Sequence, residues 1–385
     1  METTSYPKEI QVFFDEIVVK INNVLDADFI LIAGSFGKKS WLYFNNELIS
    51  DFEFVFVCSK PWSLKKKSQL LRKLNSEYPY EINLKGFLSK KVENKIISNY
   101  ALKNPGYISL DFFDTFSNPI FLYNKNDDVL DIDCEASEIP VWEAWRLYVN
   151  RMADLLKLDC SKNPDSKKVD YYWLKIFEST AGAYCIINEI YHKNISKRLA
   201  IFNKELIEQD EELNETCKNS FPFINHALLA RDKHDLILFK NSLSVDERKE
   251  IIISWMDYFE RKLSIQESLQ IESNNFNNRY LKNRLLQKKY LGFSHKFNII
   301  VSNLVRFIYN PKLLNLKFKF YNNKYSWRHI VLLCVSSTFK EQYYGIQNFP
   351  KTKKIITKIV TKKSIDNLNN ENFIHTILGY WKILR

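Results

Sequence analysis

Two apolar runs near the N-terminus, joined by a variable loop, predict two neighbouring buried strands. The first run, Phe29–Ala33, stops at Gly34 and Ser35. An apolar run that ends in glycine and serine is typical of a buried strand followed by a tight turn. At such a turn glycine lets a phosphate group approach the backbone, and serine adds a hydroxyl donor. The first run therefore predicts a turn suited to handling a nucleotide.

The second run, Ser50–Val57, alternates with a period of two residues. Its three phenylalanines fall on one side of the predicted strand, and Asp51 and Glu53 fall on the other. Two adjacent carboxylates repel each other, so the arrangement is costly unless cations or protons neutralise them. Magnesium chelated by a nucleoside triphosphate would neutralise both groups.

Gly34-Ser35 followed by Asp51-x-Glu53 resembles the signature of the polymerase-beta-like nucleotidyltransferases. The variant Gly-Ser-Phe-Gly-Lys with Ser-Asp-Phe-Glu is similar to the aminoglycoside nucleotidyltransferases and to stand-alone bacterial nucleotidyltransferase-domain proteins. The resemblance covers about the first third of the chain. That family carries a third carboxylate between apolar residues on a later strand, and Glu81 in Tyr80-Glu81-Ile82 fits this position. Asp111 is a rival for the third position, although it comes later than the family pattern places it.

The resemblance implies an enzyme that moves a nucleoside monophosphate from a nucleoside triphosphate to an acceptor and releases pyrophosphate. Two magnesium ions stabilise the attacking and leaving oxygens in such a reaction. The implied catalytic and metal-binding residues are Asp51, Glu53 and Glu81. The implied nucleotide-binding residues are Gly34, Ser35, Lys38 and Ser50.

The acceptor stays open at the level of sequence. A sugar, a sugar phosphate, a protein side chain and an RNA end are all compatible with the chain, whereas its basic C-terminal third argues against a polycationic aminoglycoside. In relatives the helical part completes the acceptor pocket and can supply a general base. Glu143 and Asp154 lie near the start of that part, although ordinary exposed helix acids are the expectation for both. The alternative function is a nucleotide- or RNA-binding protein that has lost turnover.

Length and periodicity predict an α+β protein of several modules. At 385 residues the chain is too long for one small domain, and Pro140 marks a change from sheet-like to helical periodicity. We expect a mixed-sheet nucleotidyltransferase domain over 1–138, a helical domain over 139–270, and a basic, helical region over 271–385.

Further elements follow from apolar spacing and from turn signals. Helices are expected over Pro7–Leu25, Ser63–Glu77 with Ser63 as its cap, Lys90–Leu102, Val141–Leu155, Asp170–His192, Phe221–Phe239, Arg248–Leu269 and Lys351–Lys363. Additional strands are expected over Gly106–Phe113 and Ile120–Tyr123.

The positive charge of the chain is concentrated in its last third. Of the net charge of +11, residues 271–385 carry 21 Lys and Arg against 4 Asp and Glu, so the remainder is acidic. Such asymmetry predicts an anionic partner for this region, namely RNA or a membrane surface. Within it, the lysines of 351–363 fall on one side of a predicted helix, for which a solvated face is the simpler interpretation.

Composition also bears on the compartment. The six cysteines are scattered without paired spacing, which favours reduced thiols over disulfides or a zinc site. The N-terminus lacks a cationic start followed by an apolar run, and no stretch approaches the roughly twenty apolar residues of a membrane span. A cytoplasmic location without a transmembrane segment is therefore the expectation.

Overall fold

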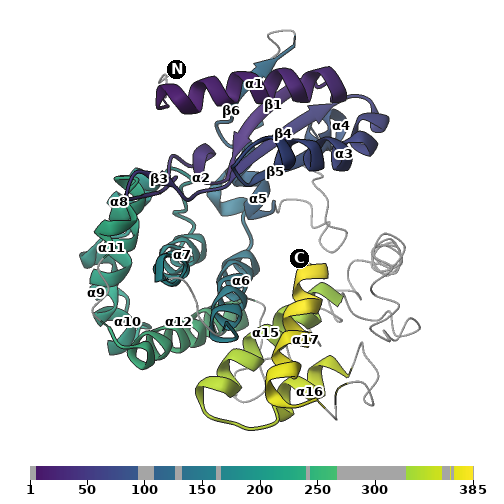
Figure 1. Cartoon of the computed structure of the whole chain (residues 1–385). Coiled ribbons are helices and arrows are strands. Elements are labelled where there is room, and N and C mark those ends of the chain that lie inside the picture. Colours follow the sequence, from purple (N-terminus) through teal and green to yellow (C-terminus); the bar gives the residue numbers. More distant parts are fainter. Residues whose placement is uncertain are drawn as a thin grey trace.

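The computed structural model describes residues 6–93, 108–125, 132–161, 166–239, 243–266, 327–357, 365 and 368–384. An N-terminal four-stranded mixed sheet is followed by helices (Figure 1). The strands are β1 (Phe29–Ala33), β4 (Phe52–Cys58), β5 (Ile82–Leu88) and β6 (Ile120–Asn124), with a separate hairpin of β2 (Tyr43–Phe44) and β3 (Glu47–Leu48).

Strand β1 lies in the middle of the sheet, whose order is β5-β4-β1-β6. It pairs antiparallel with both β4 and β6. Strand β5 runs parallel to β4, and the chain crosses between them through α3 (Pro61–Glu77). The antiparallel register places Ala33 opposite Glu53, so the turn after β1 meets the start of β4.

The two faces of the sheet belong to two different cores. Phe52, Phe54 and Phe56 pack against α1 (Lys8–Leu25) and α3, as the alternation in β4 predicts. Val55 and Val57, on the opposite face with Asp51 and Glu53, join a larger core that continues into the helical part. In Figure 1, α1 lies above the sheet, and α6 and α7 stand below it.

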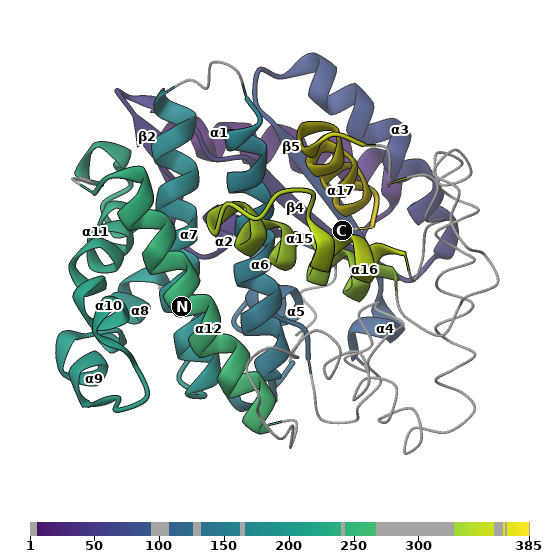
Figure 2. The same cartoon turned by 90° about the horizontal axis from the view of Figure 1, so that it is seen from below.

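The helices of the second core begin with α6 (Val141–Asp159) and α7 (Ser166–Ile187). Seen from below, these two helices lie in front of α2 (Gly34–Gly37) and the sheet (Figure 2). The remaining helices of this part are α8 (Ile195–Ile201), α9 (Lys204–Gln209), α10 (Glu215–Asn219), α11 (Phe221–Asp232), η2 (Leu236–Leu238) and α12 (Val245–Gln266).

Three described helices near the C-terminus pack onto this helical part: α15 (Trp327–Tyr343), α16 (Pro350–Ile356) and α17 (Asn370–Leu384). Lys340 on α15 pairs with Asp257 and Glu260 on α12 at 2.7 and 2.8 Å. The indole of Trp381 on α17 donates to the side chain of Asn150 on α6 at 3.1 Å. These polar contacts join the C-terminal helices to the earlier ones.

Several predicted elements are confirmed, with shifted ends. The N-terminal helix, the helix before Pro79, the strand after Asn118 and the helix after Pro140 are all present. The predicted strand over Gly106–Phe113 is wrong: Leu110–Phe116 forms helix α5, because Ser109 caps it by accepting the backbone N–H of Phe112. Ser63 lies inside the first turn of α3 rather than capping it, since the helix begins at Pro61.

Two further predicted helices are described only in part. Helix α4 (Ser89–Glu93) covers the start of the predicted Lys90–Leu102 helix, and α16 covers the first half of the predicted Lys351–Lys363 helix. In α16, Ile355 and Ile356 are buried and Lys351 is exposed, as in a solvated lysine face over an apolar stripe. Most of the basic segment 271–326 lies outside the described residues.

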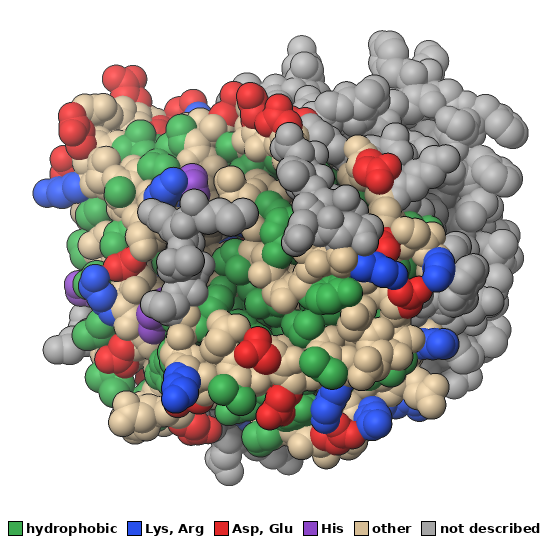
Figure 3. All heavy atoms as spheres, turned by 90° about the horizontal axis from the view of Figure 1, so that it is seen from above, with side chains coloured by type: hydrophobic (Ala, Val, Ile, Leu, Met, Phe, Trp, Pro, Cys, Tyr) green, Lys and Arg blue, Asp and Glu red, His purple; other side chains and the backbone are tan. Residues whose placement is uncertain are grey.

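The surface that carries α1 mixes both signs of charge with apolar side chains (Figure 3). None of the helices in the described part of the chain has the length and apolarity needed to cross a bilayer. All six cysteines are described, and no disulfide joins them.

Candidate functional site

Gly34 occupies a backbone position that glycine alone fills without strain. Its φ angle is +59°, in the left-handed region that other residues rarely adopt. A Cβ atom placed on it would lie 2.9 Å from the side-chain Cγ and Cδ of Glu53. The absence of a side chain therefore allows the turn to touch the acidic strand directly.

The turn continues as the short helix α2, which presents Ser35 next to this contact. The Ser35 Oγ is buried, and among the described residues it has no hydrogen-bond partner. Its carbonyl oxygen accepts hydrogen bonds from the backbone N–H and the hydroxyl of Ser40 at 2.7 and 3.3 Å. The backbone of Ser35 is thus held in place by Ser40.

An aromatic stack fixes α2 between the sheet and the helical part. Phe36 stacks on Phe52 and on Trp41, with ring centroids 4.4 and 5.3 Å apart. Trp41 stacks in turn on His234, which follows α11, at 3.8 Å. Arg231 also donates to the carbonyl oxygen of Ser40 at 2.9 Å. The helical part therefore holds the turn from the side opposite β4.

Asp51, just before β4, and Glu53, within it, each have a partner on β5. The amide of Asn83 donates to Asp51 Oδ2 at 2.9 Å, and the ammonium of Lys85 lies 3.0 Å from Glu53 Oε2. Asn83 is in register with Glu53 across the parallel pair. Cross-strand partners share a face, so β5 presents an amide and an ammonium group to the acidic pair.

Glu81 lies beside Asp51, one residue before β5 begins. Its carbonyl oxygen accepts the backbone N–H of Phe52 at 2.9 Å, and the residue is exposed. The charge of Glu81 also acts on Tyr172 of α7, whose pKa is raised first by burial and further by nearby acids. Glu81 is therefore close to the acidic strand and faces the helical part.

Ser50 is buried, and its hydroxyl oxygen accepts the backbone N–H of Leu42 at 2.9 Å. This bond closes the loop that contains the β2–β3 hairpin onto the start of β4. The nucleotide-binding role predicted for Ser50 thus competes with an existing structural hydrogen bond.

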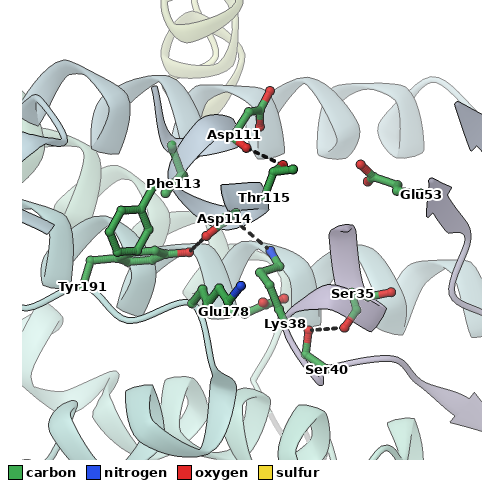
Figure 4. A network of polar contacts seen from close by, with 12 residues as sticks. Ser35, Lys38, Ser40, Glu53, Asp111, Phe113, Asp114, Thr115, Glu178 and Tyr191 are labelled. Atoms are coloured by element: carbon green, nitrogen blue, oxygen red, sulfur yellow. Dashed lines mark hydrogen bonds and ion pairs between the residues drawn. The ribbon is translucent and has the colours of Figure 1, made fainter. Parts of the chain in front are cut away.

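Lys38 lies at the end of α2 between two carboxylates (Figure 4). Its ammonium nitrogen is 3.7 Å from Asp114 Oδ2 on α5, and Tyr191 donates to Asp114 Oδ1 at 2.8 Å. Burial raises the pKa of Tyr191 far above its ordinary value, and Asp114 adds to this rise, so the tyrosine stays a donor. In the same view the carboxylate of Glu53 points from β4 toward α2 and α5.

Glu178 on α7 is the second carboxylate near Lys38. Burial raises its pKa, but the charges of Arg231, Lys38, Arg198 and Arg151 outweigh burial and bring the pKa to about 2. The side-chain nitrogens of Arg231 and Arg198 lie 2.9 and 3.8 Å from it. Glu178 is therefore ionised and fixes the position of several cations below the turn.

The two general-base candidates of the helical part are buried, which corrects the expectation of exposed acids. Glu143 is 1% exposed, pairs with Arg146, and accepts the backbone N–H of Leu110 at the start of α5. Asp154 is 6% exposed and pairs with Arg151 at 2.9 Å. Glu143 is a structural residue because its oxygens already join two helices.

Four residues near the site were not predicted from the sequence: Asn83, Lys85, Asp114 and Glu178. The first two follow Glu81 at steps of two residues, so the strand alternation gives a signal for their shared face. Asp114 was not predicted because a strand was expected over Gly106–Phe113, which ends just before it and covers the first half of its helix. For Glu178, a carboxylate in the apolar middle of a long helix was the available signal.

The carboxylates of Asp51 and Glu53 fit a magnesium ion that arrives with a triphosphate. Mg²⁺ prefers oxygen ligands and commonly takes one or two carboxylates together with waters and substrate phosphates. Among the described residues, no group of three or more His, Cys, Asp or Glu side chains is placed to hold a metal ion by itself. Asp51 and Glu53 could therefore supply two of the oxygen ligands of such an ion, with the others coming from water or phosphate.

No protein-family model matches the chain, and no curated protein matches it in sequence.

Proposed function

We propose that this chain is a metal-dependent nucleotidyltransferase that moves a nucleoside monophosphate from a nucleoside triphosphate to a hydroxyl or phosphate acceptor. The observation that carries the proposal is the contact between Gly34 and Glu53. It brings together the two halves of the motif, the Gly-Ser turn and the acidic strand, and this proximity supports the proposal.

The residues around this contact have complementary tasks. The buried Ser35 hydroxyl would donate to a phosphate oxygen, which supplies the partner that a buried polar atom needs. The Lys38 ammonium, positioned by Asp114, would bind the triphosphate by charge. Asp51 and Glu53 would hold Mg²⁺, which supplies charge neutralisation for in-line displacement of pyrophosphate. Glu81 would lie on the acceptor side.

A second candidate function is nucleotide binding without turnover. The observation that favours it is that Asn83 and Lys85 already pair with the two carboxylates that catalysis would need for its metal, Asp51 and Glu53. In this case the basic region 271–385 would hold RNA or an anionic membrane surface. The two candidates share the turn and differ in whether pyrophosphate is released.

A measurement of pyrophosphate release distinguishes the nucleotidyltransferase from the binding protein. We expect release from at least one of the four ribonucleoside triphosphates with magnesium and cell extract as the source of acceptor. Asp51→Asn and Glu53→Gln should lower the rate by about 100-fold or more, because each removes a charge that the metal needs. Glu77→Gln, which removes an exposed carboxylate from α3, should leave the rate unchanged.

The controls decide between failure of the site and failure of folding. Far-ultraviolet circular dichroism should be the same for all four proteins. Magnesium-dependent nucleotide binding without pyrophosphate release from any triphosphate would favour the binding protein. Equal rates in wild type and both acidic-strand variants would reject the site.

A further inference from the structure

Strand β5 brings a positive charge to the acidic pair of β4. Because β4 and β5 are parallel neighbours, alternate residues of both strands face the same side of the sheet. Asn83 lies opposite Glu53, and Lys85 is the next residue of β5 on the same face, two positions further along. Its ammonium nitrogen is 3.0 Å from Glu53 Oε2. The two side chains are 42% and 26% exposed, so ions from solvent can reach the pair.

The neighbouring acid is stabilised in a different way. Asp51 accepts a hydrogen bond from the neutral amide of Asn83 at 2.9 Å. The two carboxylates repel each other, and the Lys85 ammonium supplies the positive charge that offsets this repulsion on the Glu53 side. The acidic pair is therefore partly neutralised by the chain itself.

A divalent cation bound to Glu53 would conflict with this ion pair. Mg²⁺ binds carboxylate oxygens at about 2.1 Å, and an ammonium group at hydrogen-bond distance from the same carboxylate would lie only a few ångströms from the metal. Two cations at that separation repel each other. The metal and the Lys85 ammonium therefore compete for the negative charge of the Glu53 carboxylate.

We propose that Lys85 is a resident cation at the Glu53 side of the metal site, which a divalent metal ion must displace in order to bind. The proposal rests on the function proposed above, since it concerns the same carboxylates. Lys85 thereby lowers the affinity of the protein for metal alone. A triphosphate that carries its own metal can compensate, because the displaced ammonium is then close to phosphate oxygens that attract it.

The test measures metal affinity directly, without turnover. The full chain is titrated with Mn²⁺, and unbound Mn²⁺ is followed by its electron paramagnetic resonance signal. Lys85→Met should bind Mn²⁺ on the order of tenfold more tightly than wild type, because a competing charge is removed. Lys85→Arg keeps the charge and should bind like wild type.

Two further variants control for general effects of charge. Lys73→Met removes another lysine that pairs with a glutamate, Glu77, on the outer helix α3, and it should leave Mn²⁺ binding unchanged. Glu53→Gln should abolish the gain from Lys85→Met when the two are combined, because the ammonium then has no carboxylate to compete for. Circular dichroism and melting temperature confirm that each variant is folded.

The outcomes separate this proposal from the proposed function. Equal Mn²⁺ affinity in wild type and Lys85→Met, with binding lost in Glu53→Gln, overturns the resident cation and leaves the metal site standing. If Lys73→Met increases Mn²⁺ affinity as much as Lys85→Met does, the effect comes from net charge alone, and the proposed role of Lys85 is overturned. If no variant binds Mn²⁺ and a fluorescent nucleoside triphosphate does not bind either, the proposed function fails, and this inference fails with it.

Discussion

Gly34 is the residue on which the geometry of the site depends most directly. In Gly34→Ala the left-handed backbone costs about 1 kcal/mol, and the added methyl group pushes against Glu53. We expect a loss of about 1–2 kcal/mol in the free energy of unfolding, and nucleotide affinity at least about tenfold weaker, since Ser35 and Glu53 move apart. Urea unfolding and titration with a fluorescent nucleoside triphosphate measure the two effects.

Gly345 offers the matched control for this substitution. It has a similar φ angle of +65°, but a Cβ atom there would meet nothing within 4 Å. Gly345→Ala should therefore show the backbone strain alone and bind nucleotide as wild type does. Equal nucleotide affinity in both variants would contradict the role given to the Gly34–Glu53 contact.

Glu178 shows how a single buried charge ties acid stability to the site. Its pKa falls from 4.5 to about 2 on folding, so its contribution is complete above pH 4.5 and is lost as the pH falls toward 2. That shift corresponds to about 3 kcal/mol at pH 7. Glu178→Gln should be less stable than wild type by about this amount at pH 7.

The pH dependence provides the check on this prediction. At pH 3 the difference between wild type and Glu178→Gln should shrink to about half, because the Glu178 carboxylate is then mostly protonated in the unfolded chain but still mostly ionised in the folded one. Urea unfolding at both pH values measures the free energies. A difference that stays constant between pH 7 and pH 3 would show that lost packing, rather than charge, explains the variant.

At the scale of elements, the spacing of apolar residues predicted those strands and helices that bury one clearly apolar face. The alternation in β4 and the helical spacing of α1 are both confirmed, because each element packs its apolar side against the other. The pattern failed at α5. Its run of Leu, Phe and Thr suits a strand, but the cap at Ser109 and the hydrogen bond that the backbone N–H of Leu110 donates to Glu143 favour a helix.

Only those contacts of the candidate site that join residues close together in the sequence could be predicted. Gly34 lies close to Glu53 because it begins the turn after β1, and β4 then pairs antiparallel with β1. The partners Asn83 and Lys85 depend on the parallel register between β4 and β5, which the connecting helix sets and which no local pattern specifies. The cations around Glu178 likewise come from separate parts of the sequence: Lys38 from the end of α2, Arg151 from α6, Arg198 from α8 and Arg231 from α11.

At the scale of the whole molecule, the sheet is the boundary between two cores. The smaller core is closed by α1 and α3 within the first ninety residues. The larger core begins on the other face of the same sheet and continues through α6, α7 and the C-terminal helices. Asp51 and Glu53 lie at the edge of this shared layer, so the helical part both covers the sheet and borders the site.

This shared core makes a prediction about the boundary near Pro140. A fragment of residues 1–138 keeps the smaller core but exposes Leu31, Val55 and Val57, which are fully buried in the whole chain. Each such side chain contributes roughly 2 kcal/mol when it is buried. We expect the fragment to bind a hydrophobic dye and to melt without a cooperative transition, whereas the full chain melts cooperatively.

A fragment of residues 1–270 is the matched comparison, because it restores α6, α7 and α12 over that face of the sheet. It should regain a cooperative transition and lose most of the dye binding. Cooperative melting of 1–138 without dye binding would show that the sheet is a separable domain. In that case the helical part would serve the site without stabilising the sheet, and variants of α7 such as Glu178→Gln should leave the melting of the sheet unchanged.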